Sequence, residues 1–375
     1  MIKFQKKQIR GAILETAKKR AVYYDVMRIV AIFLVLLTHT PAYTLYFFNT
    51  GLKQWTCLFA SVTIKICVPL FFMISGALLL GKDEKWGTIL KKRVSRFAIT
   101  IVLFELLYVL VKYLVTLSRG SEFNYTFLDL LGGIFAGDII GLESYWYMYA
   151  HLGILLSLPF LRAVAKNMKK SDFIALTLFH FIIWTLIPAV LLLLPDHNIE
   201  GTLIHKDFTI PLAAVKSMYF PLAGFWLDRN VNVEKIRRKE IALICVIYIS
   251  AVLVSSLFAI LEQKYTGACT LFYVEMFAYF ITGCAFLLIK YYYSGTRAKL
   301  SAGLSRAVCA VGALSFSMYI FEPFCKLFFE ETYFNYVSPR FPMILNSVVW
   351  CFFCMIAGGT VGALLKKVPG VRSLL

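Results

Sequence analysis

Long apolar runs follow one another along the chain, separated by short polar connections. Most runs are close to the roughly 20 residues that an α-helix needs to cross the hydrocarbon core of a bilayer. The pattern predicts an all-α polytopic membrane protein with about ten transmembrane helices. We expect them near residues 24–46, 57–80, 97–117, 144–165, 172–194, 209–227, 240–260, 270–290, 307–329 and 342–365.

Composition supports the membrane assignment. Hydrophobic residues make up 60% of the 375 residues, whereas charged residues make up only 16%, and the mean hydropathy is +0.74. Soluble domains usually contain about 25% charged residues. The predicted spans occupy so much of the chain that no large soluble domain is expected.

The net charge of +18 is distributed unevenly. Alternate connections, assigned to one side of the membrane, hold most of the 39 Lys and Arg residues; those of the other side hold only Lys53, Arg119, Lys206, Lys264 and Arg340. An excess of Lys and Arg marks the cytoplasmic side of a membrane protein. The bias predicts an even number of spans with both termini in the cytoplasm, and it explains the positive charge without a nucleic-acid partner.

The chain is expected to have three parts: a basic cytoplasmic segment at 1–22, a transmembrane domain at 23–366 and a short cytoplasmic tail at 367–375. The basic segment lacks the small-residue cleavage site of a signal peptide, and it could lie on anionic lipid as a surface helix. Two polar outer connections, 118–143 and 195–208, either contact an extracellular acceptor or are simply solvated.

The nine cysteines carry little functional signal. Cys351 and Cys354 form a CxxC pair, but it lies within an apolar run and has no second pair. We interpret both as small hydrophobic residues that pack between helices. The sequence therefore predicts no metal site.

Arg28 and His39 are the most informative pair in the chain. They lie eleven residues apart in the first span, which is about three helical turns, so both side chains share one helix face. Ionisable residues inside a membrane span mark functional sites by default. His39 could act as a general base or merely pack against a neighbouring carbonyl, and Arg28 could bind an anion, reach lipid phosphates or pair with Asp25.

Lys65 and Ser75 lie in the second predicted span, on either side of Pro69. Proline frees backbone groups that need a partner or a cavity in the membrane. The Ser75-Gly76 pair is equally typical of close helix packing. Both interpretations remain open from the sequence.

Arg93 and Arg96 lie three residues apart at the predicted cytoplasmic edge of the third span. Two guanidinium groups on one face suit phosphate recognition, although they could be ordinary positive-inside charge. Glu322 is an acid within the ninth span, and Lys326, four residues on, is its obvious partner. Glu105 and Glu275 are further intramembrane acids without an evident partner.

Several of these motifs occur together in the order found in one family. The chain resembles the acyltransferase 3 family of bacterial membrane O-acyltransferases in Arg28-x10-His39, in VPLFFMISG at 68–76 with Lys65 where Arg is common, and in Arg93-x-x-Arg96. SYWYMYAHLGILLSLPFLR at 144–162 and SFSMYIFEP at 315–323 are similar to two further family segments. One departure is that Glu322 stands where the family usually has His.

The resemblance implies a multi-pass protein of the bacterial plasma membrane. Its function would be to transfer an acyl group, usually acetyl, from cytoplasmic acyl-CoA to a hydroxyl of a cell-surface polysaccharide or lipid-linked glycan. His39, Arg28 and Ser75 would be catalytic, with Ser75 stabilising an oxyanion or carrying a transient acyl group. Arg93, Arg96 and Lys65 would bind the donor. Glu322, Tyr319 and Trp146 would contact the acceptor, and acyl-CoA would be a substrate, with no permanently bound cofactor.

Two other function classes fit the apolar pattern. An exporter of a glycan or lipid-linked sugar would use the 21 Tyr and 6 Trp residues to stack sugars. A membrane sensor or scaffold would need the intramembrane polar residues only for helix packing. Dependence on acyl-CoA distinguishes the enzyme from the exporter. A cellular phenotype retained after removal of Arg28, His39 and the Arg93/Arg96 pair together would favour the sensor or scaffold. The acceptor, the acyl group and the oligomeric state are not fixed by the sequence.

Overall fold

All regular secondary structure in the described parts of the chain is helical. The computed structural model describes residues 21–40, 50–121, 126–194, 211–268, 270, 272–294, 298, 300–340 and 342–375, and no strand occurs within them. The all-α prediction is therefore confirmed for these residues. Most of the predicted segment 1–22, the end of the first span and the connection 195–208 lie outside them.

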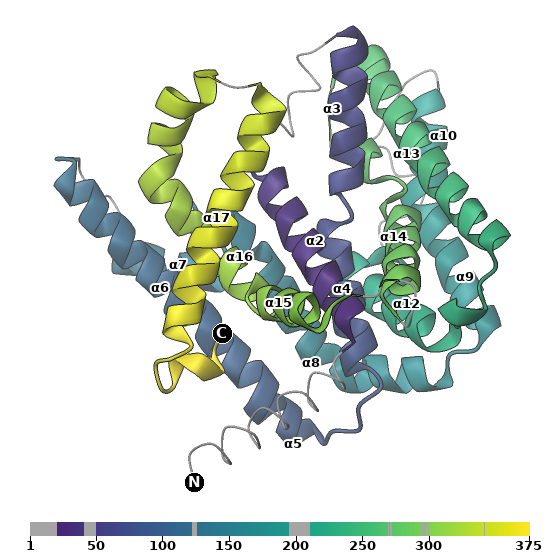
Figure 1. Ribbon diagram of the computed structural model, residues 1–375, viewed down its shortest axis with the longest axis horizontal. Helices are drawn as coiled ribbons and strands as arrows, with labels where there is room; N and C mark the ends of the chain where they lie inside the picture. The colour runs from purple at the N-terminus through teal and green to yellow at the C-terminus, as the bar shows by residue number, and fades with distance from the viewer. Residues whose placement is uncertain are drawn as a thin grey trace.

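The main helices alternate with short turns (Figure 1). In chain order they are α2 (Val22–Thr38), α3 (Gly51–Ile64), α4 (Cys67–Leu79), α5 (Trp86–Ile89), α6 (Ser95–Ser118), α7 (Phe127–Ala136), α8 (Trp146–Asn167), α9 (Lys170–Phe181), α10 (Ile187–Leu193), α11 (Pro211–Ala214), α12 (Lys216–Asn230), α13 (Arg238–Thr266), α14 (Ala278–Tyr293), α15 (Ala302–Gly312), α16 (Ser315–Cys325) and α17 (Met343–Leu365). Single π-helical turns join α5 to α6 (Leu90–Val94), join α9 to α10 (Ile182–Leu186) and extend α16 (Lys326–Glu330).

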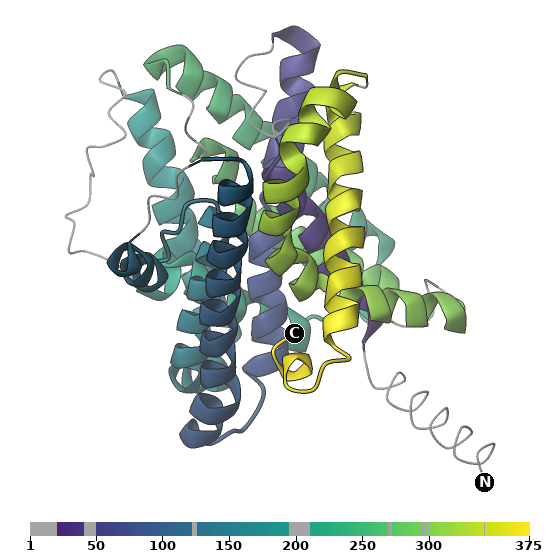
Figure 2. The same ribbon diagram turned by 90° about the vertical axis from the view of Figure 1, so that its left-hand side faces the viewer.

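Seven helical stretches of the described residues are long and apolar enough to cross a membrane: Gly51–Leu79, Trp86–Ser118, Glu143–Asn167, Lys170–Leu193, Arg238–Thr266, Tyr273–Tyr293 and Ile344–Leu365. An eighth is counted if Ala302–Gly312 and Ser315–Glu330 form one span, although they are bent by 51°. Figure 2 shows α15 lying across the direction of α17. The other two predicted spans correspond to α2 and α12, which have only 17 and 15 residues. Ten spans with cytoplasmic termini remain a prediction.

The helix that carries Arg28 and His39 lies in the middle of the molecule. In Figure 1, α2 lies between α3 and α4 on one side and α16 and α17 on the other. It contacts α4, α14, α15, α16 and α17, and its Met27, Ala31 and Ile32 are completely buried. Because neighbours surround α2, Arg28 and His39 face protein or a cavity instead of lipid.

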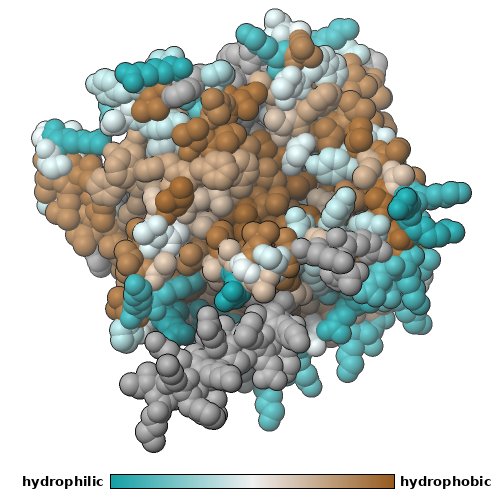
Figure 3. Space-filling model, viewed as in Figure 1, coloured by the Kyte–Doolittle hydropathy of each residue, from teal (hydrophilic) through white to brown (hydrophobic). Residues whose placement is uncertain are grey.

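The outward-facing surface suits a bilayer. Apolar residues cover the middle of the face seen in Figure 3, and hydrophilic residues gather towards its upper and lower edges. Helices α6 and α13 expose many large apolar side chains, among them Leu110, Leu114, Leu243 and Val246. Exposed apolar surface of this extent is what lipid contact requires.

The predicted polar connection 118–143 contains a helix. Thr126 and Asp129 form a reciprocal capping box at the start of α7, which satisfies two backbone N–H groups at the helix end. The helix ends at Gly137, whose φ of 68° favours glycine. The hydrophobic residues at 127–136 could have predicted this helix. The acidic residues around them instead favoured a polar connection without a helix.

Candidate functional site

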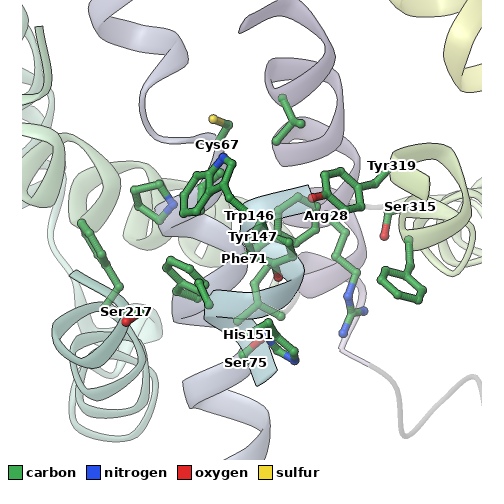
Figure 4. Close-up of a pocket in the computed structure, with 18 of the residues that line it drawn as sticks. Arg28, Cys67, Phe71, Ser75, Trp146, Tyr147, His151, Ser217, Ser315 and Tyr319 are labelled. Atoms are coloured by element: carbon green, nitrogen blue, oxygen red, sulfur yellow. The ribbon is translucent and has the colours of Figure 1, made fainter. Parts of the chain in front are cut away.

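A large cavity gathers most of the candidate residues. It has a volume of about 780 Å³ and lies among α2, α4, α6, α8, α12 and α16. We call it the first cavity. Eight of the nine residues predicted from the sequence line it: Arg28, His39, Lys65, Ser75, Arg93, Arg96, Trp146 and Tyr319. Figure 4 shows Arg28, Ser75, Tyr147, His151 and Tyr319 around a common space.

Arg28 and His39 both line the first cavity from the central helix α2. Arg28 donates a hydrogen bond of 2.7 Å from Nη1 to Oδ1 of Asp25, whose side chain is completely buried. The predicted Asp25–Arg28 pair is thus confirmed, yet the guanidinium remains 23% exposed. His39 follows the last residue of α2 and caps its end. The two residues that were predicted to share one helix face therefore both line the same cavity.

Glu322, the ninth candidate, contacts His39 directly. Its Oε1 lies 3.4 Å from Nδ1 of His39 and 2.9 Å from Nζ of Lys326. The Glu322 side chain is only 2% exposed. The predicted Glu322–Lys326 pair is confirmed, and the structure adds the imidazole to it. A carboxylate beside one ring nitrogen orients an imidazole and leaves the other nitrogen for chemistry.

Arg93 is held by an acid that the sequence analysis did not single out. Its Nε and Nη2 donate to the two oxygens of Glu84 at 2.9 and 2.6 Å. Arg162 of α8 donates to Glu84 from its own Nη2 at 2.7 Å. The hydrogen bond from Arg93, followed by the bond from Arg162, lowers the pKa of Glu84 to about 2. Arg96 is exposed and lines the same cavity.

Lys65 belongs to a second charged cluster on the wall of the first cavity. Its Nζ lies 2.5 Å from Oε1 of Glu275, and Nζ of Lys216 lies 2.6 Å from Oε2 of the same carboxylate. Lys216 also packs over the ring of Trp184, 4.2 Å from its centroid. Glu275, left without a partner in the sequence analysis, thus joins two lysines from different helices. Lys65 itself lies at the break between α3 and α4.

The two residues of the Ser75-Gly76 pair have different roles. Ser75 lines the first cavity, whereas Gly76 packs against α12. A Cβ atom added to Gly76 would overlap the backbone carbonyl of Pro221. The packing interpretation holds for Gly76, and Ser75 remains available to a ligand. Cys351 and Cys354 are completely buried free thiols, as predicted.

Aromatic side chains form much of the remaining wall. Tyr319 donates a hydrogen bond to the carbonyl of Ser144, which ties α16 to the turn before α8. His151, which the sequence analysis passed over, also lines the cavity. Its ring centroid lies 5.0 Å from that of Phe97 and 5.8 Å from that of Tyr147. A histidine inside a predicted span was the signal that could have identified it.

A second cavity, of about 440 Å³, meets the first at His39. It lies among the end of α2, the turn before α8 and the π-helical extension of α16. Its lining residues are His39, Tyr108, Gly141, Glu143, Ser144, Trp146, Glu322, Lys326, Leu327 and Glu330. His39, Ser144 and Trp146 line both cavities. One imidazole can therefore face ligands in both.

Comparison with known proteins supports the resemblance noted in the sequence. No curated protein and no solved structure matches the chain. The family model of an acyltransferase domain, acyltransferase 3, matches residues 21–366, which is nearly the whole chain. The match includes every candidate residue described above. The protein therefore belongs to the acyltransferase 3 family and is a membrane acyltransferase.

Proposed function

We propose that the protein transfers an acyl group, most simply acetyl, from cytoplasmic acyl-CoA to a hydroxyl of a cell-surface polysaccharide or lipid-linked glycan in the bacterial plasma membrane. One observation carries this proposal. His39 lines both cavities, and the first of them is bordered by Lys92, Arg93 and Arg96. A donor and an acceptor could thus approach one general base from two cavities.

The basic border of the first cavity suits the phosphates of CoA. Guanidinium groups recognise phosphate oxygens through paired hydrogen bonds. Arg96 is exposed, and Arg93 is fixed in place by Glu84, so little side-chain freedom would be lost there on binding. From this border, the pantetheine arm would run along the cavity and bring the thioester towards His39. Ser75 would face the same space and could donate to the developing oxyanion.

The chemistry needs one base that later becomes an acid. As the acceptor oxygen attacks the thioester carbonyl and the new C–O bond forms, Nε2 of His39 takes the hydroxyl proton. When the C–S bond breaks, the same proton goes to the leaving CoA sulfur. The imidazolium exists only between these steps. Glu322, 3.4 Å from Nδ1, would orient the ring and stabilise that positive charge.

The test uses purified protein in lipid vesicles with radiolabelled acetyl-CoA and a cell-envelope fraction as acceptor. His39→Ala should lower the rate of ester formation by about 100- to 10,000-fold, the usual contribution of a general base. Acetyl-CoA binding, measured on the same sample, should change little and serves as the folding control. Ester formation by His39→Ala at a near wild-type rate would refute the role of His39. Wild-type protein that neither binds acetyl-CoA nor forms an ester would refute the function.

A further inference from the structure

The second cavity has the features of a carbohydrate site. Its volume of about 440 Å³ lies within the range of about 300–1,000 Å³ that is typical of small-molecule sites. The connection that ends in Gly141, Glu143 and Ser144 is predicted to lie on the outer side of the membrane, where a surface glycan is found. The cavity also reaches His39, the base required by the proposed acyl transfer, on which this inference rests.

The ionisable lining of the second cavity is predominantly acidic. Glu143, Glu322 and Glu330 contribute three carboxylates, and Lys326 contributes one ammonium group. Lys326 lies 2.9 Å from Glu322 and offsets that charge. Among the described lining residues, the carboxylates therefore outnumber the positive charges by two when His39 is neutral. Like charges close together repel, so this lining disfavours a ligand that carries its own acid group.

One oxygen of the buried Glu322 carboxylate can still accept a hydrogen bond from a ligand. Its side chain is 2% exposed, and its Oε1 lies beside Nζ of Lys326 and Nδ1 of His39. Its Oε2 accepts no hydrogen bond from the described residues. Buried carboxylate oxygens are normally hydrogen-bonded. Sugar hydroxyls are suitable donors, and a sugar in the second cavity would lie beside both Glu322 and His39.

A large indole provides the apolar surface of the same cavity. Trp146 is 52% exposed although it lines both cavities. An exposed aromatic face next to convergent polar groups is typical of a small-molecule site, and the C–H face of a pyranose ring is a suitable partner for it. The cavity thus offers an aromatic surface for the apolar face of a sugar ring and carboxylate acceptors for the hydroxyl groups at its edge.

We propose that the second cavity is the acceptor subsite and selects a sugar unit without an acid group, either neutral or amine-bearing. Trp146 supports the ring face, and Glu322 accepts a hydrogen bond from a sugar hydroxyl. Glu330 and Glu143 exclude acidic sugars by charge. Charge selectivity, and not only affinity, is therefore built into the wall of this cavity.

The test compares two probes that differ in charge but hardly in shape, methyl β-glucuronamide and methyl β-glucuronide. Their dissociation constants for the full-length protein in nanodiscs are measured by saturation-transfer NMR, which needs no turnover. We expect the acid to bind at least about tenfold more weakly than the amide. Glu330→Gln should reduce this ratio, and Glu330→Lys should bring it close to one or reverse it.

Glu331→Lys is the matched control, because Glu331 is 76% exposed, pairs with Arg119 at 3.8 Å and does not line the second cavity. It should leave the ratio unchanged. Equal binding of both probes to wild-type protein, or a ratio that responds equally to the changes at 330 and 331, would overturn the proposal. Since these are binding measurements, they stand apart from acyl transfer. If the wild-type protein neither bound acetyl-CoA nor formed an ester, that result would instead refute the proposed function and leave the binding preference for the two probes to be judged separately.

Discussion

Replacing Glu322 with Gln is the sharpest perturbation of the proposed mechanism. The substitution keeps the size of the side chain and removes its negative charge. In the structure that charge lies 3.4 Å from Nδ1 of His39 in a nearly enclosed position. We expect the variant to fold and to bind acyl-CoA, because Glu322 does not line the first cavity, but to turn over slowly.

The magnitude follows from the ion pair that forms when His39 takes the proton. At 3.4 Å, a carboxylate and an imidazolium attract each other by about 5 kcal/mol at an effective dielectric constant of about 20. Lys326, 2.9 Å from the same oxygen, offsets part of this attraction. If roughly half remains, the loss is about 2–3 kcal/mol in the transition state. That corresponds to about a 30- to 150-fold decrease in kcat.

The assay measures kcat and both KM values for ester formation from radiolabelled acetyl-CoA in vesicles. We expect kcat to fall, KM for acetyl-CoA to stay within about twofold, and Glu322→Asp to recover part of the rate because it restores the charge. A purely structural role would affect Gln and Asp variants alike. A Glu322→Gln protein with kcat within threefold of wild type would refute the reasoning.

Three further outcomes follow from the same geometry. Gly76→Ala should destabilise the protein by about 3 kcal/mol or abolish folding, since the carbonyl of Pro221 occupies the space; thermal unfolding in detergent measures this. Arg96→Gln should raise KM for acetyl-CoA about tenfold with little change in kcat, which initial-rate kinetics would show. Because the pKa of Glu84 is lowered to about 2, its stabilising contribution should be complete above about pH 4.5 and lost as the pH falls through about 2. Acid unfolding of wild type and Glu84→Gln should therefore differ at neutral pH and converge at low pH.

Local pairs were predictable from the sequence, because helix geometry alone brings their members together. Asp25 and Arg28 lie three residues apart, and Glu322 and Lys326 lie four residues apart on continuous helix. Such spacings place side chains on one helix face whatever the tertiary structure. The gathering of most candidate residues around one cavity is a finding of the structure, because the order of the motifs does not determine which helices become neighbours.

The long-range pairs were not predictable, because they depend on which helices become neighbours. Glu84 and Arg162 lie 78 positions apart, and Lys65 and Glu275 lie 210 positions apart. The contact between His39 and Glu322 likewise needs α2 to pack against α16. The hydropathy pattern does not show which helices pack against each other. It also overlooks the bend between α15 and α16, where Ser315 bonds to the carbonyl of Gly312.

The charges around the first cavity follow one physical rule. A charged side chain in a region of low dielectric constant is stable when it is paired. Arg28, Arg93, Lys65 and Lys216 each lie within 2.7 Å of a carboxylate. Such pairing fixes their positions but leaves less of their charge for a phosphate.

Arg96 differs from these residues. It is exposed, and within the described residues no carboxylate forms an ion pair with it. Its charge is therefore the one most available to a donor phosphate, whereas Arg93 contributes a fixed position beside it. This division explains why removal of Arg96 should weaken donor binding directly. Removal of Glu84 should instead act by releasing Arg93, and so it should affect stability before it affects donor affinity.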